Sequence, residues 1–145
     1  MVETDALEAA SSKMLSPDGT ASSNYRKRAG KKGEDRAAAF LEAAGLRIIG
    51  RNIRSQAGEV DIVALDGDTL VFVEVKSWTA YTIENLEYGI GEKKQQRIIE
   101  TAKHFLKNHR EYRDMSIRFD VVFIQADAVT HIVSAFTESV WLLSK

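Results

Sequence analysis

The chain has 145 residues, no cysteine and a formal net charge of −1, from 20 basic and 21 acidic side chains. This length suits one domain, and the lack of cysteine excludes disulfide bonds, thiolate metal sites and cysteine nucleophiles. No apolar run approaches the roughly 18–20 residues that span a bilayer, and the acidic N-terminus is unlike a secretory signal. We therefore expect a cytoplasmic protein with no membrane partner.

The near-neutral total hides a sorting of charge along the chain. Residues 26–54 carry a balance of +6 and residues 93–113 carry +5, whereas residues 55–92 carry −7. Charge runs commonly form solvated faces. The alternative is a phosphate-binding surface beside a carboxylate cluster that holds a cation. The net charge therefore does not exclude a nucleic-acid partner.

The first part of the chain predicts an arm followed by a helix and a strand. Residues 1–25 are rich in Ala, Ser and Thr and predict a flexible N-terminal arm, with one α/β domain over residues 26–145. After a basic lead-in, apolar residues recur at helical spacing from Gly33, and Gly45 is a natural stop. Residues 46–53 then predict a strand.

Two β-rich runs, residues 60–65 and 70–76, are separated by Asp66-Gly67-Asp68, which is a strong hairpin signal. A long connection over residues 77–91 leads to a helix over residues 93–109, whose apolar residues share one face.

Two further strands are expected over residues 117–124 and 131–136. The predicted order is α-β-β-β-α-β-β. The fold class that follows is α/β, with a central mixed β-sheet flanked by helices.

Three charged residues on the hairpin strands are the main functional candidates. Side chains alternate along a strand, so Glu74 and Lys76 share one face. A Gly67-Asp68 loop pairs Asp61 directly with Glu74, whereas an Asp66-Gly67 loop places Asp61 on the diagonal. Either loop puts Asp61, Glu74 and Lys76 on one face, and a three-residue loop would break this parity.

Two carboxylates at this range repel each other unless a positive group lies between them. A hard cation such as Mg²⁺ or Mn²⁺ meets this need, because it takes one or two carboxylates together with waters and phosphate oxygens. Asp61 and Glu74 are therefore candidate metal ligands, and Lys76 is a candidate to hold the attacking water or stabilise developing phosphate charge. The alternative is an ion-paired network on a solvated face. The apolar neighbours of Glu74 instead indicate a strand buried on both sides, where unpaired charge is costly.

Asp61 followed by Glu74-Val75-Lys76 resembles the PD-(D/E)xK signature of restriction-endonuclease-like nucleases, with Val60 in place of the proline. Over residues 26–137 the chain is similar to the YraN-type family of small bacterial proteins. The motifs that carry this resemblance, in order, are Gly33-Glu34, Gly45, Arg51-Asn52, Gly58-Glu59-Val60-Asp61, Phe72-Val73-Glu74-Val75-Lys76, Lys94-Gln95 and Arg118-Phe119-Asp120-Val121.

The resemblance implies a restriction-endonuclease-like core and a Mg²⁺-dependent phosphodiesterase site. It implies that Asp61 and Glu74 bind the metal and that Lys76 activates water. It adds two catalytic candidates, Glu34 as a further acidic residue and Gln95 as a supporting polar residue. Without the resemblance, Glu34 is a favourable charge near a helix N-terminus and Gln95 is a solvated glutamine.

Basic side chains near this cluster are candidates for nucleic-acid binding, which would be strongly salt-dependent. These candidates are Lys93, Lys94, Arg97, Arg51 and Arg54. No Gly-rich phosphate loop is present, so nucleotide-driven chemistry is not expected.

The sequence therefore predicts a metal-dependent nuclease that hydrolyses nucleic-acid phosphodiester bonds, with branched or structured DNA as a candidate substrate. The first alternative is a nucleic-acid-binding module that keeps the nuclease fold without catalysis. The second is an assembly protein with no nucleic-acid role. A homodimer would suit an enzyme that cuts DNA junctions, and the sequence leaves the oligomeric state open.

Overall fold

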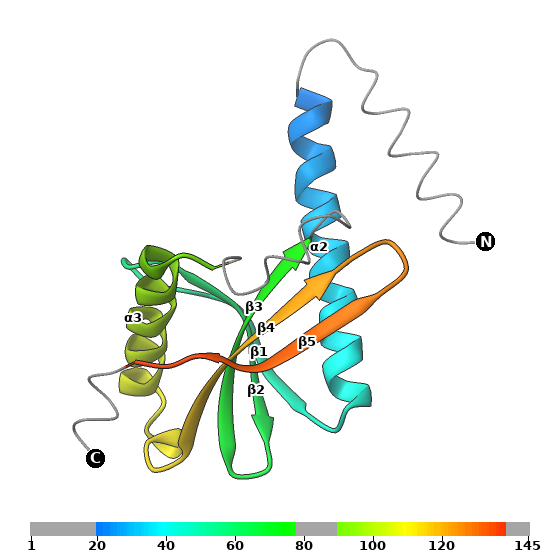
Figure 1. The fold of residues 1–145 in the computed structure, drawn as a ribbon. Helices are drawn as coiled ribbons and strands as arrows, with labels where there is room; N and C mark the ends of the chain where they lie inside the picture. The colour runs from blue at the N-terminus through cyan, green and yellow to red at the C-terminus, as the bar shows by residue number, and fades with distance from the viewer. Residues whose placement is uncertain (1–19, 78–89, 139–145) are drawn as a thin grey trace.

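The computed structural model describes residues 20–77 and 90–138, with the backbone alone described for residues 20–29. In these ranges a five-stranded sheet lies between two helices (Figure 1). The elements, in order, are α2 (Thr20–Ala43), β1 (Arg47–Arg54), β2 (Glu59–Asp66), β3 (Thr69–Ser77), α3 (Glu92–Asn108), a short 3₁₀ helix (Arg110–Tyr112), β4 (Ser116–Ile124) and β5 (Val129–Phe136). The predicted α/β class and the order α-β-β-β-α-β-β are confirmed.

The sheet is mixed, with strand order β1-β2-β3-β4-β5. β3 and β4 are parallel, whereas all other neighbouring strands are antiparallel. A parallel pair needs a crossover connection, and α3 lies within the segment that joins β3 to β4. β3 is the central strand, which explains its nearly continuous apolar sequence, because both of its faces are covered.

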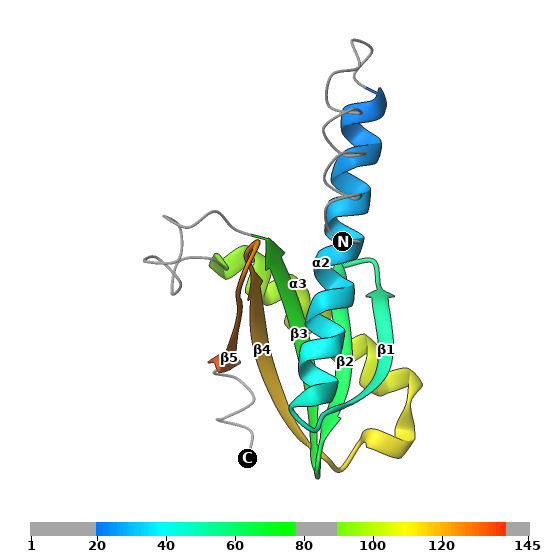
Figure 2. The ribbon, with the colours of Figure 1, turned by 90° about the vertical axis from the view of Figure 1, so that its right-hand side faces the viewer.

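Each helix covers one face of the sheet, as the two views in Figures 1 and 2 show. Ala37 and Leu41 of α2 pack on one face with Val71 and Val73 of β3. The apolar stripe of α3 packs on the other face. The main residues of this second core are Ile98, Ile99, Ala102 and Phe105 of α3 with Leu70, Phe72, Phe119 and Phe123 of the sheet. The result is a three-layer α/β/α arrangement.

α2 is longer at its N-terminus than the sequence indicated. It begins at Thr20, so the basic lead-in over residues 26–32 is helical backbone, and this half of α2 projects past the sheet (Figures 1 and 2). Apolar periodicity missed it because a helical segment that packs on no sheet needs no apolar stripe. The helix ends as predicted, with Gly45 at a φ of +97°.

The predicted division into an arm over residues 1–25 and a domain over residues 26–145 remains a prediction, because residues 1–19 lie outside the described ranges. The same holds for most of the connection expected over residues 77–91. Within the described ranges, no helix is both long and apolar enough to cross a membrane.

The hairpin between β2 and β3 has a two-residue loop. Asp66 pairs with Thr69, which leaves Gly67 and Asp68 as the loop. Gly67 has a φ of +58°, a conformation that favours glycine. Of the loops considered from the sequence, the Gly67-Asp68 loop is the one observed. It fixes the register of the two strands that carry the candidate site.

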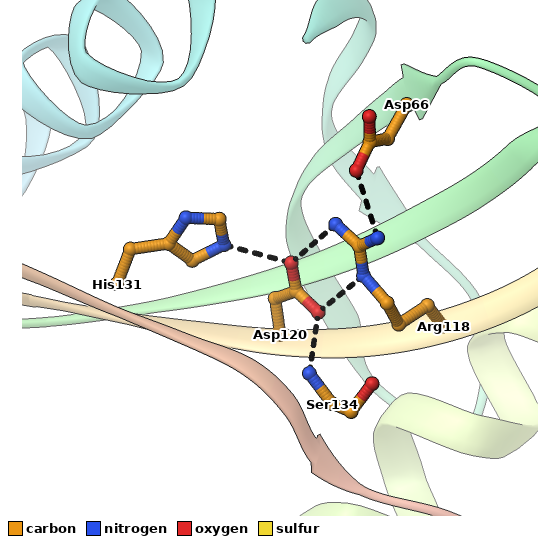
Figure 3. Close-up of polar contacts among 5 residues, drawn as sticks. All are labelled: Asp66, Arg118, Asp120, His131 and Ser134. Carbon is orange, nitrogen blue, oxygen red and sulfur yellow. Dashed lines mark hydrogen bonds and ion pairs between the residues drawn. The ribbon is translucent and has the colours of Figure 1, made fainter. Parts of the chain in front are cut away.

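A buried ion-pair network ties β4 to β5 and to the hairpin (Figure 3). Arg118 donates through Nε and Nη2 to the two oxygens of Asp120, at 2.9 and 3.0 Å, and through Nη1 to Asp66 at 2.8 Å. Nε2 of His131 lies 2.7 Å from Oδ2 of Asp120. The backbone N–H of Ser134 donates to Oδ1 at 3.0 Å. Asp120 is thereby fully buried yet fully paired.

The same network includes a residue at an irregular point of β5, Ser134. Ser134 has a φ of +53°, and the register between β4 and β5 shifts opposite Asp120. Burial alone would raise the pKa of Asp120. The hydrogen bonds from His131, Arg118 and Ser134 outweigh that effect and hold the pKa below its ordinary value. Asp120 therefore stabilises the fold in its ionised form.

We expect Asp120→Ala to lower the free energy of unfolding by about 3–5 kcal/mol, because it leaves the mostly buried side chains of Arg118 and His131 without the carboxylate that they share. Asp127→Ala, which removes an exposed carboxylate, should change stability by less than about 0.5 kcal/mol. Urea unfolding checks both. The folded pKa is depressed, so the difference between wild type and Asp120→Ala should shrink as the pH falls below about 4. Equal stability of the two variants would contradict this role.

Candidate active site

The hairpin register brings two carboxyl groups into contact. Ile62 pairs with Val73, and one further step along the same register brings Asp61 to Glu74. A hydrogen bond between the two side chains, which forms when one of the carboxyl groups is protonated, contributes to the raised pKa of Asp61. Oδ2 of Asp61 also accepts the backbone N–H of Val75 at 2.7 Å, which fixes the aspartate against β3.

These two groups line a cavity of about 370 Å³ at the end of β3. Lys76, two residues after Glu74, lines the same cavity. The structure thus brings the three principal residues predicted from the sequence, Asp61, Glu74 and Lys76, to one site. The remaining charged side chains in its walls are Glu59, Lys94 and Arg97.

Lys94 of α3 forms an ion pair with Glu74. Its Nζ lies 2.8 Å from Oε2 of Glu74, whose side chain is only 5% exposed. Burial would lower the pKa of Lys94, but the hydrogen bond to Glu74 and the charges of Glu74 and Asp61 raise it. From the sequence, Lys94 was expected to contact phosphate, and its ion pair with Glu74 was not predicted. The sequence signal for this ion pair is the acidic block over residues 55–92, which is followed directly by the basic start of α3.

Asp61 has an unusually high affinity for a proton. Burial, the hydrogen bond to Glu74 and the charge of Glu74 raise its pKa from 3.8 to about 7, against the opposing effects of Val75 N–H and Lys94. At neutral pH the two carboxyl groups therefore hold a proton between them for part of the time. A cation bound by both carboxylates would relieve the same repulsion.

Glu34 approaches this pair from α2. Gly33 lets α2 come close to the end of β3, because a Cβ at Gly33 would lie 3.0 Å from Oγ of Ser77. Burial and the negative charge of Asp61 raise the pKa of Glu34, whereas Arg51 and a hydrogen bond from Asn52 lower it. Glu34 is thus electrostatically coupled to Asp61, although it does not line the cavity.

Asn52 was not singled out from the sequence, although it stands in the Arg51-Asn52 motif. It has a φ of +52°, which is unusual for a residue other than glycine. This backbone conformation accompanies the hydrogen bond that its side chain makes with Glu34. Asn52 therefore belongs to the surroundings of the candidate site.

Gln95 lies outside the cavity. Its Nε2 donates to the backbone carbonyl of Ile90 at 2.9 Å, just before α3. It lines a second, mostly apolar cavity of about 280 Å³ beside β5. The structure therefore does not bring Gln95 to Asp61 and Glu74, and its catalytic role stays a prediction.

The predicted nucleic-acid-binding residues differ in their partners. Arg51 pairs with Asp35 at 2.7 Å and with Glu34 at 3.6 Å, and Arg54 pairs with Glu59 at 3.1 Å. Within the described ranges, the exposed Lys93 and Arg97 have no carboxylate partner. Arg97 lies beside Gly58, where a Cβ would come within 3.1 Å of the arginine side chain. It therefore offers the cavity an unpaired positive charge.

The donor set suits a hard divalent cation. Asp61 and Glu74 offer carboxylate oxygens, and Mg²⁺ commonly takes one or two carboxylates with waters and phosphate oxygens. Among the described residues, no group of three or more His, Cys, Asp or Glu side chains converges to hold a metal ion. A cation at Asp61 and Glu74 would thus keep positions for water and substrate.

Comparison with known proteins gives a consistent result. The model of Uncharacterised protein family UPF0102 matches residues 33–124. A UPF0102 protein of Treponema pallidum (strain Nichols) is 42% identical over 123 residues, covering 80% of this chain and 98% of the relative. The UPF0102 protein of Treponema denticola is 45% identical over 105 residues, 68% and 81% of the two chains. That of Persephonella marina is 41% identical over 107 residues, 74% and 91%.

We expect Asp61→Asn to stabilise the metal-free protein by roughly 1 kcal/mol or more at pH 8, with a smaller effect at pH 5. The raised pKa means that folding favours the protonated carboxyl. Stability from Asp61 is therefore lost as the pH rises from about 4 through about 7. Asn mimics the protonated form and keeps an acceptor for Val75 N–H. Urea unfolding in the presence of a chelator provides the measurement.

The matched control for this prediction is Asp68→Asn, in the exposed hairpin loop at the other end of β3. It should change stability by less than about 0.5 kcal/mol at either pH. A stabilisation by Asp61→Asn that does not depend on pH would show that the buried negative charge is not the cause.

Proposed function

This chain belongs to the UPF0102 family, the YraN type, and from its carboxylate cavity we propose that it is a metal-dependent nuclease acting on phosphodiester bonds. The observation that carries this proposal is the pairing of the half-buried Asp61 with the buried Glu74 in a cavity that Lys76 also lines. Two carboxylates held against each other, one of them buried, cost free energy unless a cation joins them. The three-layer mixed-sheet fold, consistent with a nuclease-like core, supports the same proposal.

Each residue has a role in this proposal. Asp61 and Glu74 hold Mg²⁺ or Mn²⁺, which supplies the positive charge that polarises a phosphodiester. Lys76 orients the attacking water and stabilises negative charge as it develops on the phosphate. Glu34, through its coupling to Asp61, adds negative charge that favours a cation at the site. Arg97 contacts a flanking phosphate from the wall of the cavity.

The proposed substrate is nucleic acid, with DNA first and branched or structured DNA as a specific candidate. A polyanion needs positive charge beside the carboxylates, and Lys76, Lys94 and Arg97 provide it within the cavity walls. A homodimer would present two such sites to a DNA junction, and sedimentation of the protein with and without junction DNA tests that arrangement.

One observation favours the alternative of a nucleic-acid-binding module. Nζ of Lys94 already neutralises Glu74 at 2.8 Å, so a metal-free site has a counter-ion of its own. In that case salt-sensitive binding would persist in Asp61→Ala and weaken when Lys93 and Arg97 are replaced, with no cleavage under any conditions.

We expect Mg²⁺- or Mn²⁺-dependent cleavage of at least one of three labelled DNA substrates, which are duplex, single-stranded and four-way-junction DNA. Glu74→Gln should abolish cleavage because it removes a metal ligand. Lys76→Ala should slow single-turnover cleavage by about 10²–10³-fold, because it removes the positive charge that acts on the reacting phosphate. A gel assay with a chelator control measures both effects.

Asp68→Asn is the matched control here as well, because it removes a carboxylate from the same hairpin at the opposite end. It should cleave at the wild-type rate. If wild type and Glu74→Gln give identical products with every substrate and both metals, the nuclease proposal is wrong, and binding without cleavage then supports the alternative.

A further inference from the structure

We propose that the projecting N-terminal half of α2, residues 20–32, is a second contact surface for the nucleic-acid backbone, continuous with the rim of the carboxylate cavity. This inference rests on the proposed function for the identity of the ligand. It adds that the substrate extends beyond the cavity in one defined direction, along α2.

The first argument is that α2 lies beside the end of β3. Gly33 lies against the end of β3, where its absent Cβ would come within 3.0 Å of Oγ of Ser77. Ser77 directly follows Lys76, which lines the cavity. The helix therefore passes the same end of the sheet that holds the carboxyl groups. From there its N-terminal half continues past the strand ends, as Figures 1 and 2 show.

The second argument is the strongly positive charge of residues 20–32. Residues 20–32 contain five basic and no acidic residues. Those basic residues are Arg26, Lys27, Arg28, Lys31 and Lys32. Within the described part of the chain, the exposed Lys31 and Lys32 have no carboxylate partner. Arg51, Arg54 and Lys94 in contrast all pair with carboxylates.

The dimensions fit a nucleic-acid strand. Thirteen helical residues span about 20 Å at a rise of 1.5 Å per residue. Phosphates along one strand of a duplex are spaced about 3.4 Å apart along the axis, so this length corresponds to roughly six of them. Polar side chains and cations on a helix that projects from an active-site rim would track that strand by charge, without reading its sequence.

A lipid surface is a poorer match for the same charges. Binding of a helix to a membrane interface requires a large apolar face besides cations. Residues 20–32 contain no Leu, Ile, Val, Met, Phe or Trp, and their apolar content is two alanines and Tyr25. The segment therefore has almost no apolar side chains to insert into a membrane, whereas binding of a polyanion requires only the positive charges of the segment.

The test compares two triple variants that remove equal charge from opposite ends of the molecule. The first is Arg28→Gln, Lys31→Gln and Lys32→Gln in α2. The control is Lys107→Gln, Arg110→Gln and Arg113→Gln, exposed positions near the start of β4, which pairs with the start of β3. Gln is a good helix former, so the substitutions should preserve helix, and circular dichroism and urea unfolding verify that both variants fold.

Fluorescence anisotropy measures affinity for a labelled 20-base-pair duplex between 50 and 200 mM salt, with a chelator present so that no cleavage occurs. We expect the α2 variant to lose at least about tenfold in affinity at the lowest salt. Its slope of log K against log salt should become shallower by about 2–3, near 0.9 per lost phosphate contact. The control should keep the wild-type affinity and slope, and the charge-conserving change of Lys31 and Lys32 to Arg should too.

Equal losses in the two triple variants would overturn the proposal, because they would show a general effect of charge. Stronger dependence on α2 for vesicles with phosphatidylserine than for DNA would overturn it as well. Because binding is measured without metal, a failure to cleave DNA does not affect this result. Loss of the α2 effect with cleavage intact would refute the inference and leave the nuclease proposal standing.

Discussion

The contact between the carboxyl groups of Asp61 and Glu74 is the constraint on which the candidate site depends. The two-residue hairpin sets the register that places them together, and the hydrogen bond from Val75 N–H to Asp61 at 2.7 Å holds the aspartate there. Glu74 lies on β3, which is covered on both faces by α2 and α3, so its charge is largely shielded from water. The fold instead surrounds the pair with cations, and Lys94 is the nearest one described.

Asp120 is also a buried carboxylate, but its surroundings differ from those of Asp61 and Glu74. Arg118, His131 and the backbone N–H of Ser134 bind its oxygens, and its pKa is lowered. The pKa of Asp61 is instead raised to about 7, mainly by burial and by Glu74. Protein groups alone therefore neutralise and hydrogen-bond Asp120, whereas the carboxylate of Asp61 is stabilised by binding a proton or a cation. This difference separates a residue that stabilises the fold from a candidate for chemistry.

Much of the fold was predictable because it follows from local rules. Two β-rich runs on either side of the Asp66-Gly67-Asp68 turn signal defined β2 and β3, and the Gly67-Asp68 loop fixed which side chains face each other. The N-terminal half of α2 was missed because it projects past the sheet (Figures 1 and 2), and a helical segment that does not cover a sheet needs no apolar stripe. The ion pair of Lys94 with Glu74 and the placement of Gln95 at Ile90 depend on how α3 crosses the sheet. Sequence spacing within one element does not contain that tertiary information.

In the proposed function, a divalent cation replaces the proton that the carboxyl pair holds. Titration calorimetry with Mn²⁺ in two buffers of different ionisation enthalpy counts the protons released on binding. We expect one Mn²⁺ per chain, with close to one proton released at pH 6 and almost none at pH 9, and no binding to Glu74→Gln. Binding of Mn²⁺ that releases no proton at pH 6, or that is unaffected by Glu74→Gln, would contradict the claim.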